Sequence, residues 1–156
     1  MKEQKRPITS TEAKRSLYAL DVLSGKTAEA PEPRKKPTQK ELQIQAALFR
    51  WAEIASAKHP ELRLMFHIPN EGKRNAVTGY RLKTAGMKAG LPDICLPVAR
   101  SGRHGLFLEL KAEGGRLQDN QKEWIDELGR QGYRAAVAFG FDEARAMIED
   151  YLGGTR

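Results

Sequence analysis

The stretch LFLELKAEGGRLQDNQ, residues 106–121, places a glutamate and a lysine inside a run of leucine and phenylalanine. Its first six residues alternate, so the three leucines face one side of a strand, whereas Phe107, Glu109 and Lys111 share the other. A charged side chain in such a strand is costly to bury unless water or an ion meets it. The pattern therefore predicts either an ordinary solvated sheet face or a site that uses Glu109 and Lys111.

The preceding apolar run, DICLPVA at 93–99, predicts a second strand that is separated from the first only by the turn SGRHG. So short a turn makes the two strands an antiparallel hairpin, in which the start of one lies opposite the end of the other. Asp93 is therefore expected beside Glu109 and Lys111. Two carboxylates at one sheet end repel unless a cation lies between them, and oxygen ligands without His or Cys favour Mg²⁺ or Mn²⁺. The backbone carbonyl of Leu110 is a further candidate ligand.

Two helices are expected to bring polar side chains to the same region. In the helix that follows the turn at 112–117, Gln121 falls on the predicted apolar stripe, and an inward glutamine needs a hydrogen-bond partner. The alternative is an ordinary boundary glutamine. In the first helix, Glu41 and Gln45 share a face. Glu41 also completes a capping box with Thr38, which explains this glutamate without any chemistry.

The remaining patterns predict an α/β domain with a mixed central sheet flanked by helices, in the order α-β-β-β-α-β-α. The helix before the last strand implies a crossover connection and hence a parallel pair. Asp119 and Asp142 are the expected caps of the second and third helices. The predicted helices span 38–60, 119–129 and 142–152, and the predicted strands span 63–69, 93–99, 106–111 and 133–140.

Composition and charge restrict the class of protein. The chain has 156 residues, 40% of them hydrophobic, and a net charge of +7. No apolar run is long enough to span a membrane, and the N-terminus lacks the apolar region of a secretory signal. A single cysteine, Cys95, excludes an internal disulfide and is expected to be a small buried hydrophobe, which fits a reducing cytoplasm. We expect no membrane partner.

The positive charge is concentrated in two segments, a distribution typical of proteins that bind nucleic acid. Residues 1–37 read as a basic, flexible arm with a possible short helix that begins at Thr9, and residues 38–156 form the predicted compact domain. The segment 70–90 is the second basic stretch. His67 and His104 lack a partnered carboxylate and are expected to be structural or solvated. The candidate DNA contacts are Asn70, Lys73, Arg74, Arg81, Lys83 and Lys88.

The motifs GLPDICLPV (90–98) and LFLELKAEGGRLQDNQKEW (106–124) together resemble the PD-(D/E)XK nuclease superfamily, and within it the virus-type replication-repair (VRR-NUC) branch. The likeness consists of a P-D pair, an E-x-K pair and a helical glutamine in this order, preceded by a helix with E-x-x-x-Q. It covers about residues 38–152 and leaves the arm unexplained. Asp119 stands where a serine or threonine cap is expected, and either type can accept the first-turn N–H.

The resemblance implies Mg²⁺- or Mn²⁺-dependent hydrolysis of DNA phosphodiester bonds, with 5′-phosphate and 3′-hydroxyl products. It also implies selection of branched DNA (a Holliday junction or flap) in phage-type replication or recombination, by a homodimer active at the nucleoid. The alternatives are a catalytically inactive DNA-binding or assembly module with the same fold, and a sequence-specific restriction-type endonuclease. The implied catalytic residues are Asp93, Glu109, Lys111, Gln121 and Glu41, with Asp93, Glu109 and the Leu110 carbonyl as metal ligands.

Overall fold

The computed structural model describes residues 38–69 and 84–153, which form three α-helices, a short 3-10 helix and four strands. The expected arm at 1–37 lies outside the described residues. In chain order the elements are α2 (Gln39–Ala55), η1 (Pro60–Leu64), β1 (Phe66–His67), β2 (Ile94–Leu96), β3 (Leu106–Lys111), α4 (Asp119–Arg130), β4 (Arg134–Phe139) and α5 (Gly140–Gly153).

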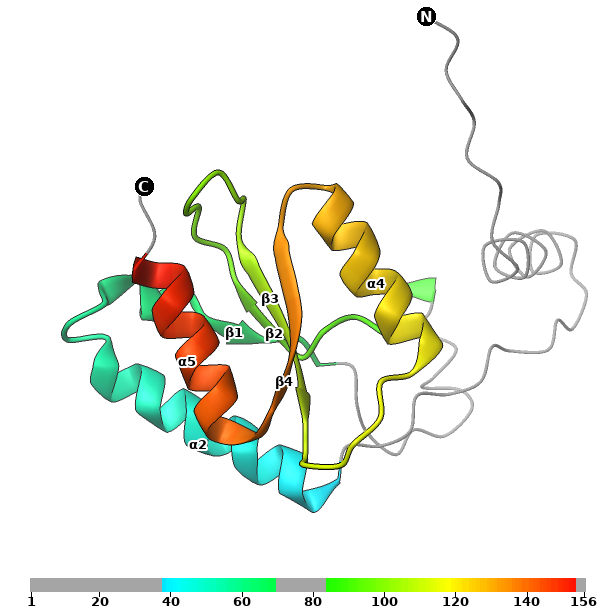
Figure 1. The fold of residues 1–156 in the computed structure, drawn as a ribbon, viewed down its shortest axis with the longest axis horizontal. Coiled ribbons are helices and arrows are strands. Elements are labelled where there is room, and N and C mark those ends of the chain that lie inside the picture. Colours follow the sequence, from blue (N-terminus) through cyan, green and yellow to red (C-terminus); the bar gives the residue numbers. More distant parts are fainter. Residues whose placement is uncertain (1–37, 70–83, 154–156) are drawn as a thin grey trace, which may run out of the picture. The chain divides into compact units, whose positions relative to one another are not determined.

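The strands form one mixed sheet in the order β1-β2-β3-β4 (Figure 1). β2 and β3 pair antiparallel, with Ile94 opposite Leu108, and β1 pairs antiparallel with β2. β3 and β4 pair parallel, with Lys111 opposite Phe139, because α4 carries the chain back to the starting edge of the sheet. The expected α/β class, the hairpin and the crossover are confirmed.

The hydrophobic core lies between one face of the sheet and the helix pair α2 and α5, which lie side by side in Figure 1. The three leucines of β3 are at most 2% exposed and share this core with Leu48 of α2 and Ile148 of α5. Alternation along β3 therefore turns Phe107, Glu109 and Lys111 toward the opposite face. The sequence pattern predicted this division correctly.

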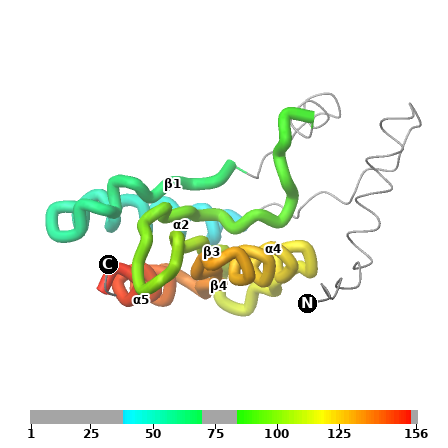
Figure 2. Tube along the Cα trace, turned by 90° about the horizontal axis from the view of Figure 1, so that it is seen from above, coloured from blue at the N-terminus to red at the C-terminus, as the bar shows by residue number. Residues whose placement is uncertain are grey.

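On the opposite face, α4 packs against β4, and Gln121 is its buried residue. The segment that begins at Thr84 approaches the sheet near the yellow, N-terminal part of this helix (Figure 2). The indole N–H of Trp124 donates to the carbonyl of Ala89 at 3.0 Å, which fixes this segment to α4. The path of the chain into Asp93 is thus set by the same helix that carries Gln121.

The first helix begins as its capping box predicts. The N–H of Glu41 donates to the Thr38 hydroxyl at 3.2 Å, and the N–H of Thr38 donates to the Glu41 carboxylate at 2.6 Å. The helix ends at Ala55, earlier than the expected break at Pro60, because residues 56–59 form a turn whose N–H groups bond back to the helix end.

Two predicted strands are shorter than expected. Residues 60–64 form the 3-10 helix in place of the start of the strand predicted at 63–69, since Pro60 suits the first turn of a helix. β2 ends at Leu96 and not at residue 99, because Pro97 has no N–H to donate to a ladder.

Both predicted aspartate caps are wrong. Gln118 caps α4, and its N–H donates to the side-chain oxygen of Gln121 at 3.0 Å, so Asp119 is already the first helical residue. α5 starts directly at Gly140, whose φ of +86° turns the chain from strand to helix without a loop. Glu143, rather than Asp142, accepts the N–H of Phe139 at 2.7 Å.

No helix in the described ranges 38–69 and 84–153 is both long and apolar enough to cross a membrane.

Cys95 gives a test of the core. It lies on β2 with 5% of its surface exposed, and burial raises the pKa of its thiol to about 11. At pH 8 the thiolate is then only about one part in a thousand of the population. We expect the folded protein to resist a thiol reagent at pH 8 and to react fully in 6 M guanidinium (about the strength that unfolds most domains). Rapid labelling of the folded chain would contradict this burial.

A pair of glycines tests the contact between segment 84–92 and α4. Gly86 and Gly90 both have positive φ, +94° and +88°, but a Cβ on Gly90 would lie 2.8 Å from the carbonyl oxygen of Asn120, whereas a Cβ on Gly86 would meet nothing within 4 Å. Gly86→Ala should therefore cost about 1 kcal/mol of unfolding free energy from φ alone. Gly90→Ala should cost clearly more. Urea unfolding curves measure both, and equal losses would refute the close approach.

Candidate active site

Glu109 is the centre of the candidate site. It lies on β3 with no exposed surface, and one of its carboxylate oxygens, Oε1, accepts hydrogen bonds from Lys111 and from Gln121. The other oxygen, Oε2, is buried and accepts no hydrogen bond within the described residues. The solvated sheet face, left open by the sequence, is therefore wrong. The helix α4 covers this face, which the strand pattern alone cannot reveal.

Lys111 links the end of β3 to α2. Its ammonium group forms an ion pair with Glu109, lies 3.3 Å from the carbonyl oxygen of Leu110 and lies 3.8 Å from a carboxylate oxygen of Glu41 on α2. Only 7% of the surface of Lys111 is exposed, so carboxylates, and not water, surround its ammonium group. Glu41 thus serves two purposes, because its other oxygen accepts the N–H of Thr38.

Asp93, which directly precedes β2, contacts the same strand. It is 4% exposed, and its Oδ2 accepts the backbone N–H of Leu110 at 2.8 Å. The antiparallel register of Ile94 with Leu108, continued by one residue, places Asp93 opposite Glu109. The two carboxylates therefore converge on one face, as the hairpin predicted.

Gln121 joins the helix α4 to the strand. Its amide nitrogen donates to Glu109, and its amide oxygen accepts the N–H of Gln118. A carboxylate oxygen can only accept from the amide nitrogen, and a backbone N–H can only donate to the amide oxygen. The two partners therefore determine the orientation of the amide group. The ordinary boundary glutamine is excluded, because this side chain is 1% exposed and bonded at both ends.

Three helices begin near this cluster. α2 carries Glu41 in its first turn, α4 carries Gln121 in its first turn, and α5 starts immediately after Phe139, the strand partner of Lys111. Helix N-termini carry partial positive charge and favour anions. The same end of the sheet thus presents three carboxylates, one ammonium group and three positive helix ends.

The donor set fits one divalent cation of the hard type. Three carboxylates and a single ammonium group have a formal net charge of −2, which such an ion would match. In residues 38–69 and 84–153, no three His, Cys, Asp or Glu side chains are grouped closely enough to form a complete cage. Mg²⁺ suits this arrangement, since it is commonly held by one or two carboxylates and takes its other ligands from water and substrate phosphate.

The residues expected to contact DNA lie mostly in a segment that the structure does not describe. Asn70, Lys73, Arg74, Arg81 and Lys83 lie outside the described residues. Lys88 is described and exposed, next to Ala89, whose carbonyl the Trp124 indole holds. This contact holds Ala89, the neighbour of Lys88, against α4, the helix that carries Gln121.

The two histidines lie differently with respect to the cluster. His67 lies on β1, and its Nδ1 is 3.0 Å from the carbonyl oxygen of Asp93. Because a carbonyl only accepts, this bond places the ring proton on Nδ1. His104 is exposed on the turn between β2 and β3, at the other end of the sheet, where its ring packs edge-on against Tyr133 at 5.6 Å.

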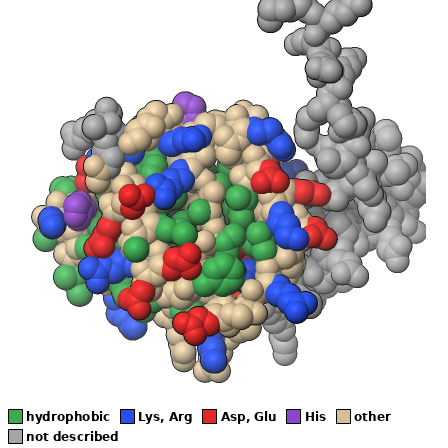
Figure 3. Space-filling view, viewed as in Figure 1, with side chains coloured by type: hydrophobic (Ala, Val, Ile, Leu, Met, Phe, Trp, Pro, Cys, Tyr) green, Lys and Arg blue, Asp and Glu red, His purple; other side chains and the backbone are tan. Residues whose placement is uncertain are grey.

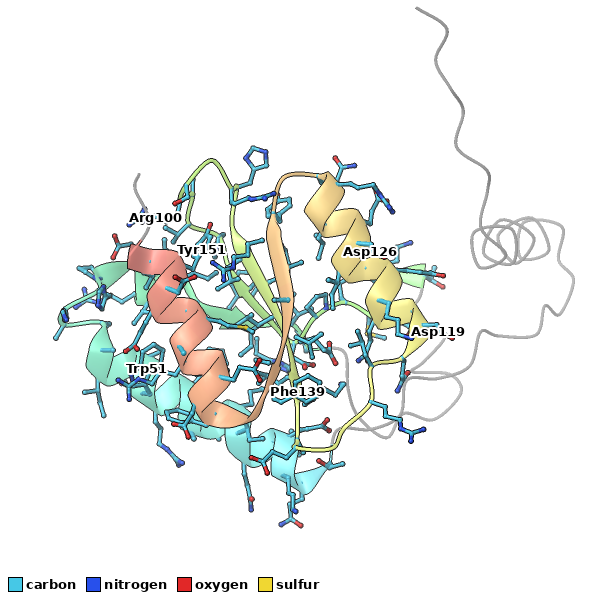
Figure 4. All side chains as sticks on the ribbon, viewed as in Figure 1. Trp51, Arg100, Asp119, Asp126, Phe139 and Tyr151 are labelled. Carbon is cyan, nitrogen blue, oxygen red and sulfur yellow. The ribbon has the colours of Figure 1, made fainter. Side chains whose placement is uncertain are left out.

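A cavity of about 850 Å³ lies away from the cluster, at the starting ends of β3 and β4. Three arginines line it, and two of them form ion pairs: Arg134 with Asp150 at 2.7 Å, and Arg100 with Glu61. These ion pairs hold the start of β4 to α5 and the segment after β2 to η1. The converging carboxylates, not this cavity, mark the candidate active site (the surrounding side chains are drawn in Figure 4).

Sequence reasoning missed two participants. The contact of Trp124 with Ala89 joins residues 35 apart, and only the apolar stripe of α4 hinted at it. Phe139 ends β4 directly beside Lys111 and is 41% exposed. The sequence signal for Phe139 was its place at the end of the strand that is expected to pair parallel with the strand of Glu109 and Lys111.

Comparisons with known proteins show which family and which fold this chain matches. The family model described as "VRR-NUC domain" matches residues 35–142. A solved structure described as "VRR_NUC domain protein" is 30% identical in sequence, covers 75% of this chain and 93% of its own, and superposes with a TM-score of 0.64. No curated protein matched the sequence.

The burial of Lys111 predicts a structural role beside any catalytic one. Lys111→Ala removes the cation from a fully buried carboxylate, so the unfolding free energy in EDTA should fall by about 3–5 kcal/mol. The matched control is Lys122→Ala on α4, whose exposed side chain pairs with Asp119 at 2.9 Å and should cost less than about 0.5 kcal/mol. Mg²⁺ should restore part of the loss in the Lys111 variant, which thermal unfolding with and without the ion would measure. Equal stability of the two variants would refute the buried pair.

Proposed function

This chain belongs to the VRR-NUC family of nucleases, and from this premise we propose that it is a metal-dependent DNA endonuclease that acts on branched DNA. The observation that supports this proposal most strongly is the buried cluster of Asp93, Glu109 and Lys111 at the end of β3. A protein that only binds DNA has no need of two buried carboxylates, because phosphate contacts require cations.

Asp93, Glu109 and the Leu110 carbonyl would hold the ion. Mg²⁺ or Mn²⁺ bound there would neutralise the scissile phosphate and make water a stronger acid. Asp93 is fixed by the Leu110 N–H and Glu109 by Gln121, so the ligands are positioned before substrate arrives. Such preorganisation is what stabilises a developing charge most efficiently.

Lys111 would orient the attacking water or stabilise the charge that develops on the phosphate oxygens. Its contacts with both Glu109 and Glu41 keep the ammonium group at the end of the strand. Gln121 and Glu41 act as positioning residues, since each touches a member of the cluster and also caps its own helix.

Selection of branched DNA follows from the small size of the domain and from a basic segment that supplies phosphate contacts, which carry no sequence information. A homodimer would place two cuts symmetrically on a branched substrate. Activity is proposed in the cytoplasm, on DNA at the nucleoid, during replication or recombination of the phage type.

Cleavage of flap, fork, four-way junction and linear duplex DNA with Mg²⁺ or Mn²⁺ tests the proposal. The informative variant is Asp93→Asn, which keeps an oxygen to accept the Leu110 N–H but removes the charge that would hold the ion. We expect it to fold normally and to lose at least about 100-fold in cleavage rate. Lys122→Ala, which removes an exposed side chain of α4 that pairs with Asp119 and not with the cluster, should cleave like the wild type.

Three results would contradict parts of the proposal. Wild-type cleavage by Asp93→Asn would remove this residue from the site. DNA binding without cleavage by any metal-loaded form would indicate an inactive binding or assembly module. Cuts at a fixed sequence in linear duplex would indicate a restriction-type enzyme.

A further inference from the structure

Phe139 lies beside the candidate site without taking part in it. It ends β4 and is the parallel partner of Lys111, with Glu109 paired to Val137 two residues earlier. Directly paired residues of neighbouring strands project to the same face, about 4.8 Å apart from strand to strand. The phenyl ring therefore shares the face on which Glu109, Lys111 and Gln121 meet.

The exposure of this ring is unusual for its position. Phe139 is 41% exposed, whereas Phe107, at the start of the same face, is half-buried and packs edge-on against Tyr133 at 5.3 Å. Figure 4 shows Phe139 at the end of β4, where the chain turns into α5, and Figure 3 shows hydrophobic side chains exposed among charges on this side. A phenyl ring left partly in water at a sheet end is available to a ligand.

The backbone beneath the ring is held firmly. The N–H of Phe139 donates to Glu143 at 2.7 Å, and the parallel ladder runs to this last residue of the strand. Gly140 follows at once with φ +86° and turns the chain into α5. The backbone that carries the ring is thus held in place before a ligand arrives.

We propose that Phe139 stacks on an unpaired nucleobase next to the scissile phosphate. This inference rests on the proposed nuclease function and names its substrate class, DNA with unpaired nucleotides at a branch. The cation and the helix N-termini at this end of the sheet can bind a phosphate. An apolar ring cannot bind a phosphate in this way, but it can stack on a nucleobase. Both faces of a base inside a duplex are already stacked, so the ring can take only a base that has left the stack.

Binding to DNA in EDTA, where cleavage does not interfere, tests this stacking with the full-length chain. The probes are a 5′ flap with 2-aminopurine at the unpaired nucleotide next to the branch and a linear duplex of the same sequence. Phe139→Ala and Phe139→Leu should each weaken flap binding by about 10-fold, within the range for loss of one stacked base, and leave duplex binding unchanged. Phe139→Trp should bind the flap within about 2-fold of wild type, since it retains an aromatic face. Wild type and Phe139→Trp should quench the 2-aminopurine fluorescence, and the other two variants should not.

Ile54→Ala is the matched control, because Ile54 is an exposed apolar residue (79% exposed) thirteen residues along α2 from Glu41, about 20 Å away. It should bind both probes like the wild type. Unchanged flap binding by Phe139→Ala, or equal losses on flap and duplex, would overturn the stacking role. Failure of the wild type to cleave any DNA would instead refute the nuclease proposal, and the binding results with Phe139 variants would stand apart from it.

Discussion

The burial of Glu109 is the constraint on which the rest of this domain depends. A carboxylate with no exposed surface is tolerated only where hydrogen-bond donors and positive charge surround it, and here β3 supplies Lys111 and α4 supplies Gln121. The need to satisfy this one group links the strand to a helix on one side and, through the lysine, to the first turn of α2 on the other. The contacts that stabilise the fold around Glu109 are therefore the same contacts that position the groups of the proposed active site.

The arrangement also separates two tasks in space. The leucine face of β3 builds the core with α2 and α5, whereas the other face carries the polar cluster beneath α4. Because side chains alternate along a strand, six residues can do both without conflict. At the far end of the sheet, the ion pair of Arg134 with Asp150 holds the start of β4 to α5, away from the end that carries the polar cluster.

Much of the fold and of the candidate site was predictable from the sequence, because the sequence patterns that determine them are local. A short turn forces a hairpin, a capping box fixes the start of α2, and strict alternation assigns the faces of β3, so Asp93 could be placed beside Glu109 from spacing alone. The failures have a different cause. Whether Glu109 is buried depends on how closely α4 packs, and Gln118 replaces Asp119 as the cap because Gln121 reaches back to it; both depend on tertiary contacts. The exposure of Phe139 likewise depends on how abruptly Gly140 turns the chain.

The cluster draws its members from α2, β2, β3 and α4, which span residues 41–121 of the chain. During synthesis, a polypeptide that has emerged only through β3 lacks the glutamine that holds the central carboxylate, so the polar cluster is incomplete. If this cluster cuts DNA as proposed, a half-made chain lacks the complete site, and cleavage can begin only once the domain has folded.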